Sequence, residues 1–127
     1  MKAIIAINNL HYIGLDNKIP WKSKEDLKHF KELTMGSSLL VGYNTAQDLP
    51  PLKGRELIIY DKNNKEFDYT KIDWCIGGKK TYEMFCNLFT ELHISYINDK
   101  TIGDVFAPEL KNLNEECKIF RYNFNID

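Results

Sequence analysis

The sequence predicts an α/β fold with a mostly parallel central sheet flanked by helices. Short apolar runs alternate along the chain with segments of helical spacing, which is the pattern of strand–helix–strand units. Hydrophobic residues make up 43% of the chain and charged residues 28%, as in globular proteins that bury one core. The 127 residues are fewer than the ~150 of a typical domain, so we expect a single domain over residues 1–127.

The first predicted strand is followed by a long loop. Ala3–Ile7 is a short apolar run that suits a strand buried on both faces. Residues 8–22 contain several Asn, Gly, Asp and Pro residues, which favour loops. Loops of this length in a compact domain commonly act as lids or binding loops.

A helix is predicted to begin after Ser23. Asp26 follows Ser23 by three residues, as in a capping box. Apolar residues then recur at helical spacing, and Gly36 ends the helix. These apolar residues are Leu27, Phe30 and Leu33.

The middle of the chain predicts two more strands around a turn. Ser38–Val41 is a buried strand that Gly42 closes, with a short helix over Tyr43–Asp48. Two prolines and a glycine make Pro50–Arg55 a turn. Leu57–Tyr60 is the next strand.

The second half predicts one more strand–helix unit and two C-terminal strands. Residues 61–73 are polar, so we expect little regular structure there. Trp74–Ile76 is a strand that leads through two glycines into a helix from Lys79 to about Phe89. Glu91–Ile97 and Lys118–Phe124 favour strands, which we expect to form an antiparallel C-terminal edge of the sheet.

Charge and hydropathy narrow the function classes. Seventeen basic and eighteen acidic residues give a net charge of −1, without the basic stripe that a nucleic-acid surface needs. The longest apolar runs are far too short for a bilayer span, and no signal-peptide pattern follows Met1. We therefore expect a cytoplasmic protein that binds neither nucleic acid nor membrane.

The cysteines and histidines suggest no metal site. Cys75, Cys86 and Cys117 form no CxxC pair, which favours free thiols in a reducing compartment. The three histidines are scattered: His11, His29 and His93. Nothing in the sequence frames a Cys–His nucleophile pair.

Asp26 is the first candidate for chemistry. It shares a helix face with Phe30 and Leu33, because residues four and seven apart lie on one side of a helix. The local pattern favours a carboxylate that only caps its helix. The functional alternative is a half-buried acid that receives a paired donor array from a flat heterocycle, with a displaced pKa.

Two glycine-led turns and one arginine are weaker signals. Gly77-Gly78 lies between a strand and a helix, where the backbone can approach a phosphate. Gly42–Thr45 has the same order. Neither GxGxxG nor GxxxxGK[ST] occurs. Arg55 could pair with a carboxylate through its planar fork, although a surface cation is the commoner role.

The order of these motifs is more informative than any one of them. The N-terminal series is Ile13-Gly14, Ile19-Pro20-Trp21, Asp26-Leu27, Phe30-Lys31 and Thr34. It continues with Val41-Gly42-x-x-Thr45, Leu52-x-Gly54-Arg55, Ile58-Ile59, Ile76-Gly77-Gly78-x-x-x-Tyr82-Glu83-x-Phe85, Ile94-Ser95, Gly103-Asp104 and Pro108. Over residues 3–108 this series resembles the dihydrofolate reductase family. The resemblance implies that family's fold in a reduced form.

The resemblance implies a folate pocket with three catalytic residues. Asp26 matches the buried carboxylate that binds the pterin amidine edge, and Ser95 matches a supporting hydroxyl. Trp21 matches a residue that holds an active-site water through its indole N–H. Arg55 matches the clamp for the folate α-carboxylate. Apolar walls around the substrate would come from Ile4, Ala6, Phe30, Leu49, Leu52 and Ile76.

The resemblance also implies a nicotinamide cofactor, NADPH, with NADH as an alternative. Hydride would pass to pterin C6 and a proton to N5, with no metal. Residues 9–22 would form a mobile lid that Asp104 braces. Residues implied at the cofactor are Ala6, Ile13, Gly14, Gly42, Tyr43, Asn44, Thr45, Asp61, Lys62, Ile76, Gly77, Gly78, Lys79, Lys80, Thr81 and Tyr82.

Departures from the family pattern concern the cofactor. Tyr43 stands where a basic residue is usual, and Lys79 where a glycine is common, while Lys80 matches a frequent arginine. Asp61 would repel a 2′-phosphate and suits a free ribose hydroxyl, whereas Lys62 argues the reverse. The stretch after Asp61 is short for the family, so part of the adenosine-binding region is trimmed and weaker cofactor binding is expected.

The hypothesis is a monomeric dihydrofolate reductase that makes tetrahydrofolate for one-carbon metabolism. One alternative is a catalytically weak or inactive homologue kept for folate binding or for structure, which the trimmed cofactor region favours. Another is the related pyrimidine reductase of riboflavin synthesis, against which the placement of Trp21 and Asp26 argues.

Overall fold

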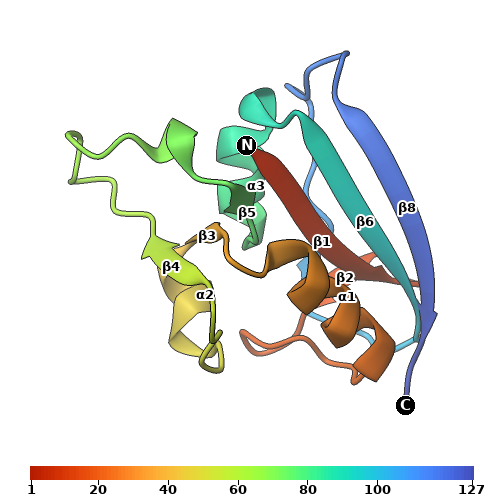
Figure 1. Cartoon of the computed structure of the whole chain (residues 1–127). Coiled ribbons are helices and arrows are strands. Elements are labelled where there is room, and N and C mark those ends of the chain that lie inside the picture. Colours follow the sequence, from red (N-terminus) through yellow and green to blue (C-terminus); the bar gives the residue numbers. More distant parts are fainter.

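A six-stranded parallel sheet forms the centre of the computed structural model, which describes all residues 1–127 (Figure 1). Its order is β4-β3-β5-β1-β6-β8, and every pairing in it is parallel. The prediction of an α/β fold with a mostly parallel sheet is confirmed. The strands are β1 (Lys2–Asn8), β3 (Ser38–Val41), β4 (Glu56–Ile59), β5 (Trp74–Cys75), β6 (Glu91–Asn98) and β8 (Lys118–Asn125).

Helices cover both faces of the sheet. α1 (Lys24–Thr34) crosses in front of the strands in Figure 1, and α3 (Lys79–Phe85) lies behind them. α2 (Tyr43–Gln47) follows β3. Because successive residues of a strand point to opposite faces, β1 serves two cores. Ala3, Ile5 and Ile7 join the larger core with α3, whereas Ile4 belongs to a smaller cluster with residues of α1. No helix is long and apolar enough to cross a bilayer.

The start of α1 agrees with its sequence signal. The Ser23 hydroxyl accepts a hydrogen bond from the Asp26 N–H at 3.2 Å, as an N-cap does. The same hydroxyl donates to the Asn125 carbonyl at 2.7 Å, which fixes the helix start to the end of β8. A local cap therefore also sets where α1 lies on the sheet.

The predicted apolar face of α1 is wrong at one residue. Phe30 and Leu33 pack toward the sheet, but Leu27 is 62% exposed. Asp26 and Thr34 are buried instead. The reason is geometric, because at 3.6 residues per turn Leu27 lies about 100° around the helix from Asp26.

The predicted arrangement of the C-terminal strands is also wrong. β6 lies inside the sheet between β1 and β8, and β8 runs parallel to β6 rather than antiparallel. An antiparallel neighbour needs only a short turn, whereas a parallel one needs a long crossover. Residues 99–117 provide that crossover. The antiparallel pairing of this structure occurs in a separate small sheet of β2 (Tyr12–Gly14) and β7 (Val105–Phe106).

The remaining segments match their predictions closely. Residues 61–73 hold only a 3-10 turn at Tyr69–Lys71. The helix predicted to Phe89 ends at Phe85 and continues as a 3-10 turn, Cys86–Leu88. The long loop after β1 includes β2 and then a tight turn, because Leu15 and Lys18 bond each other across two residues with positive φ.

Candidate active site

The turns predicted to bind ligand meet at one edge of the sheet. Gly42 follows β3, Asp61 follows the end of β4 and Gly77-Gly78 follows β5, and all these strands are parallel. The Gly42 N–H donates to the Gly77 carbonyl at 2.7 Å. In open α/β sheets ligands bind outside the carboxyl ends of the strands, so this edge is the expected place for a site.

Asp26 is the one carboxylate that α1 buries against the sheet, and it is 9% exposed. Burial raises the pKa of its carboxyl group above the ordinary value of 3.8, while Ser95 and His29 oppose the rise. The functional alternative of the sequence analysis, a half-buried acid, therefore describes its surroundings better than a solvated cap.

Two buried polar atoms of the predicted catalytic set have no hydrogen-bond partner. They are the Ser95 hydroxyl on β6 and the indole N–H of Trp21, just before α1. Ser95 lies near enough to Asp26 to lower its pKa, yet without the geometry of an ordinary hydrogen bond. Buried polar groups are nearly always satisfied, so these two atoms are suited to a polar ligand or water.

Sheet register and packing bring most of the predicted substrate residues together. Ala6 on β1 lies opposite Ser95 on β6. Leu49 is half-buried after α2, outside the apolar cluster on the α1 face. That cluster joins Ile4, Leu39 and Trp74 with Phe30, Leu33, Leu52 and Ile76. Four of the predicted wall residues thus pack in one cluster, and Leu49 lies outside it. The four are Ile4, Phe30, Leu52 and Ile76.

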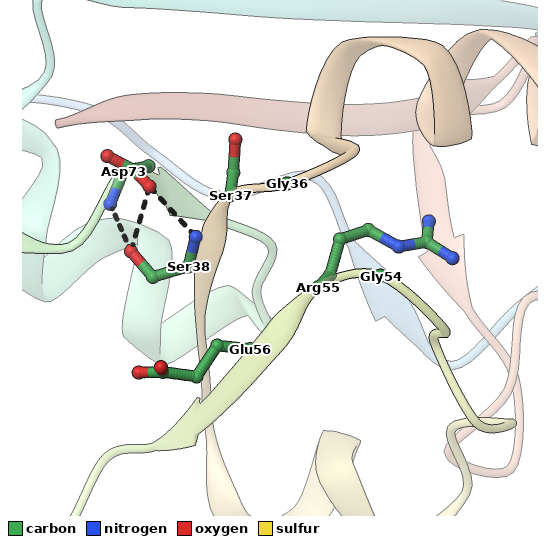
Figure 2. Close-up of a pocket in the computed structure, with 7 residues that line it drawn as sticks. All are labelled: Gly36, Ser37, Ser38, Gly54, Arg55, Glu56 and Asp73. Atoms are coloured by element: carbon green, nitrogen blue, oxygen red, sulfur yellow. Dashed lines mark hydrogen bonds between the residues drawn. The ribbon is translucent and has the colours of Figure 1, made fainter.

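Arg55 lies at the C-terminal end of α1. Its guanidinium is 5.9 Å from the centre of the Phe30 ring, and Nη1 donates to Thr34 Oγ1 at 3.4 Å. Figure 2 shows the side chain extending away from the hydrogen-bonded pair Ser38 and Asp73. Arg55 nevertheless lines, together with that pair, a polar cavity of about 530 Å³ at the N-terminal ends of β3 and β4.

The predicted cofactor residues include two interlocked glycine turns. A Cβ on Gly42 would lie 2.7 Å from Thr81 Oγ1, and a Cβ on Gly78 would lie 2.7 Å from Thr45 Oγ1. Each glycine therefore allows the hydroxyl of the opposite turn to approach. This leaves backbone groups and two threonine hydroxyls together, as a phosphate cradle requires.

The residues that depart from the family pattern surround these turns. Tyr43, Asp61, Lys62 and Lys80 are exposed, and Lys79 is half-buried. One Asp61 carboxylate oxygen accepts the Asn63 N–H at 2.9 Å, which holds it in its own loop. Asn44 is exposed beside Tyr43. Lys62 and Lys80 are thus open to solvent beside the turns, whereas the Asp61 carboxylate is held by its own loop.

The long loop after β1 contacts Asp104, as predicted. The Asp104 carboxylate accepts the Asp16 N–H at 3.0 Å, and the Asp104 N–H donates to the Gly14 carbonyl at 2.9 Å. Ile13 packs against the larger core. The loop is therefore bonded to the segment after β6 through both the carboxylate and the backbone N–H of Asp104.

Sequence reasoning missed one candidate residue, His29, which it treated as one of three scattered histidines. His29 follows Asp26 by three residues on α1, so the two side chains share a helix face, and that spacing was the available signal. The cysteines are free, and burial raises the pKa of Cys75 to about 12.

Fold and site together define an α/β ligand-binding domain with a buried acid beside an apolar wall. Comparison with known proteins identifies the class. A dihydrofolate reductase family model matches residues 1–75. A dihydrofolate reductase of Buchnera aphidicola from Schizaphis graminum is 30% identical, over 93% of this chain and 84% of that protein. The chain belongs to the dihydrofolate reductase family.

Two further relatives support this assignment. The dihydrofolate reductase of Mycoplasma genitalium is 31% identical, over 97% of this chain and 94% of its own length. The structure of an Enterococcus faecalis dihydrofolate reductase complexed with NADP(H) and RAB-propyl has a TM-score of 0.74 at 26% identity, over 87% of this chain and 77% of that one. The Mycoplasma alignment runs over 154 positions, whereas this chain has 127 residues. This chain is therefore shorter than its relative within the aligned region, as predicted.

Proposed function

We propose that this chain catalyses the reduction of 7,8-dihydrofolate to tetrahydrofolate with hydride from NADPH. The observation that carries the proposal is the buried Asp26 carboxylate beside the unpaired hydroxyl of Ser95. Burial raises the pKa of this carboxylate. The family is that of dihydrofolate reductases, which favours this reaction over the pyrimidine reductase alternative.

Asp26 and Ser95 would bind the polar edge of the pterin. An amidine-type edge offers two parallel N–H donors, which suit the two oxygens of a carboxylate. The Ser95 hydroxyl would add a further hydrogen bond, and the Trp21 N–H would orient a water. Ile4, Phe30 and the other cluster residues would cover the apolar parts of the substrate.

The glycine turns would hold the dinucleotide, and the interlocked Gly42 and Gly78 turns fit its phosphates. Bound NADPH supplies the hydride. The protein then contributes placement, a carboxylate that stabilises positive charge developing on the pterin, and a lid that limits water. We further propose a single-domain, monomeric enzyme of the cytoplasm that serves one-carbon metabolism.

Absorbance at the reduced-nicotinamide band tests the proposed reaction. Purified protein would be mixed with dihydrofolate and either NADPH or NADH. Signal loss that requires both substrate and cofactor supports the reductase. Thermal stabilisation by a folate analogue without turnover would instead favour the homologue kept for folate binding, which is the second candidate because residues 61–73 hold only one 3-10 turn.

Arg55→Gln should weaken dihydrofolate binding selectively. A charge-assisted hydrogen bond contributes ~1.5–3 kcal/mol, so KM should rise roughly 10- to 100-fold with a smaller change in kcat. The measurement is steady-state kinetics with dihydrofolate and with dihydropteroate, which lacks the glutamate. An equal loss with dihydropteroate would contradict the role of Arg55 as a carboxylate clamp.

Asp61→Asn should raise kcat/KM for NADPH and give no gain in kcat/KM for NADH. Asp61 is exposed, so removing its repulsion of a 2′-phosphate is worth about 1 kcal/mol, or roughly fivefold. The matched control is Asp68→Asn, an exposed acid of the same loop. A gain with both cofactors, or the same gain in the control, would refute a specific contact with the phosphate.

A further inference from the structure

His29 stands beside Asp26 on α1 and packs against β8. Its ring centre is 4.1 Å from that of Tyr122 and 5.2 Å from that of Phe124. Tyr122 lies opposite Ser95 in the sheet register. On α1, Asp26 therefore lies near Ser95 of β6. His29 lies against Tyr122 of β8, which is the neighbour of Ser95 in the sheet.

The imidazole of His29 is held by ring packing and not by hydrogen bonds. Its Nε2 is buried and has no partner, so nothing in the protein fixes its protonation state through a direct bond. Tyr122 is itself held, because its hydroxyl lies 2.9 Å from Nδ1 of His93, whose Nε2 lies 2.8 Å from the Glu91 carboxylate. His29 thus lies against an aromatic surface whose Tyr122 is hydrogen-bonded to β6.

The groups that face His29 come from three elements. Asp26 and Glu32 on α1 favour its charged form, and His93 on β6 opposes it. Tyr122 on β8 supplies an aromatic face, and Glu91 lies beyond it, bonded to His93. Asp26 and His29 are three residues apart on α1, so their side chains are neighbours on one helix face, and the positive charge of His29 lowers the pKa of Asp26.

Burial moves the two titrations toward each other. It raises the pKa of Asp26 from 3.8 and lowers the pKa of His29 from 6.5. While the pH stays below the pKa of His29, its positive charge opposes protonation of the nearby carboxylate. Coupled groups of this kind titrate as a pair, and removing one displaces the other.

We propose that His29 is a positioning residue whose positive charge keeps the Asp26 carboxylate ionised in the acidic part of the working pH range. The inference rests on the proposed function, because it assumes that Asp26 binds the substrate. His29 would then set the pH below which activity falls. Tyr122 and Phe124 support that role by holding the ring on the Asp26 side of α1.

The test is a pH titration of the Asp26 carboxyl carbon by NMR in protein labelled at aspartate, with the signal assigned by its loss in Asp26→Asn. In His29→Gln the Asp26 midpoint should shift to higher pH. In His29→Arg, which carries a permanent charge, it should shift to lower pH. Lys28→Gln is the matched control, because it removes a charge from the exposed side of the same helix and should cause little shift.

The pH profile of kcat/KM for dihydrofolate is the second readout. Its acid limb should move in the same direction as the NMR midpoint in each variant. An unchanged Asp26 midpoint in both His29 variants, or an equal shift in Lys28→Gln, would overturn the proposal. A shifted midpoint with an unmoved kinetic limb would support the coupling and refute the catalytic role of Asp26.

Discussion

Hydride transfer to dihydrofolate should slow by at least ~100-fold when Asp26 is replaced by asparagine, the low end for losing a group that stabilises developing charge. The amide keeps the size of the side chain and one hydrogen-bond acceptor. It loses the negative charge that favours a protonated pterin, and its NH₂ faces the donors of the substrate. Single-turnover loss of reduced-nicotinamide absorbance, with saturating NADPH, measures this step directly.

The same variant should be more stable than the parent protein near neutral pH. Because the folded pKa of Asp26 is raised above 3.8, the stability it contributes is fully present below that value and is lost as pH rises through the folded pKa. Asparagine carries no such loss. Thermal unfolding of the two proteins should therefore differ most at neutral pH and converge in acid. A folded variant with near-parent turnover would show that Asp26 is not the essential carboxylate.

Local signals predicted the elements that carry the site. The Ser23–Asp26 cap is a contact of residues three apart, and the structure contains it. Glycines after buried strands predicted the turns at Gly42 and Gly77. Only glycine lacks a Cβ, so a position where other atoms approach the backbone closely is visible in the sequence as a glycine. Family resemblance added Ser95, which no local pattern indicates.

Strand direction and contacts between distant elements could not be predicted from local sequence signals. Alternation in Lys118–Asn125 indicates a strand but does not encode its direction, so the parallel course of β8 depended on the crossover before it. His29 acquires its neighbours only when β8 places Tyr122 and Phe124 under α1. Leu27 shows a different limit, because helical spacing alone does not say which side of the helix meets the sheet.

Gly77→Ala should destabilise the protein strongly, because the substitution combines backbone strain with a steric clash. Gly77 has a φ of +107°, a conformation that costs an L-residue ~1–3 kcal/mol. The added Cβ would also lie 2.8 Å from the Tyr82 ring, and overpacking of this kind costs a further ~1–3 kcal/mol. Tyr82 cannot easily move, because it is buried and its hydroxyl donates to the Ile4 carbonyl at 2.6 Å.

Because the Gly77 turn is also the proposed phosphate cradle, Gly77→Ala should weaken NADPH binding along with stability. Gly36→Ala is the matched control, since Gly36 has a φ of +78° but its Cβ would meet nothing within 4 Å. It should cost only the backbone penalty of ~1–2 kcal/mol and leave cofactor binding intact. Urea unfolding and NADPH fluorescence titration measure the two effects. Equal losses of unfolding free energy in both variants would show that the Tyr82 contact adds nothing, and the strained backbone alone would then account for the glycine.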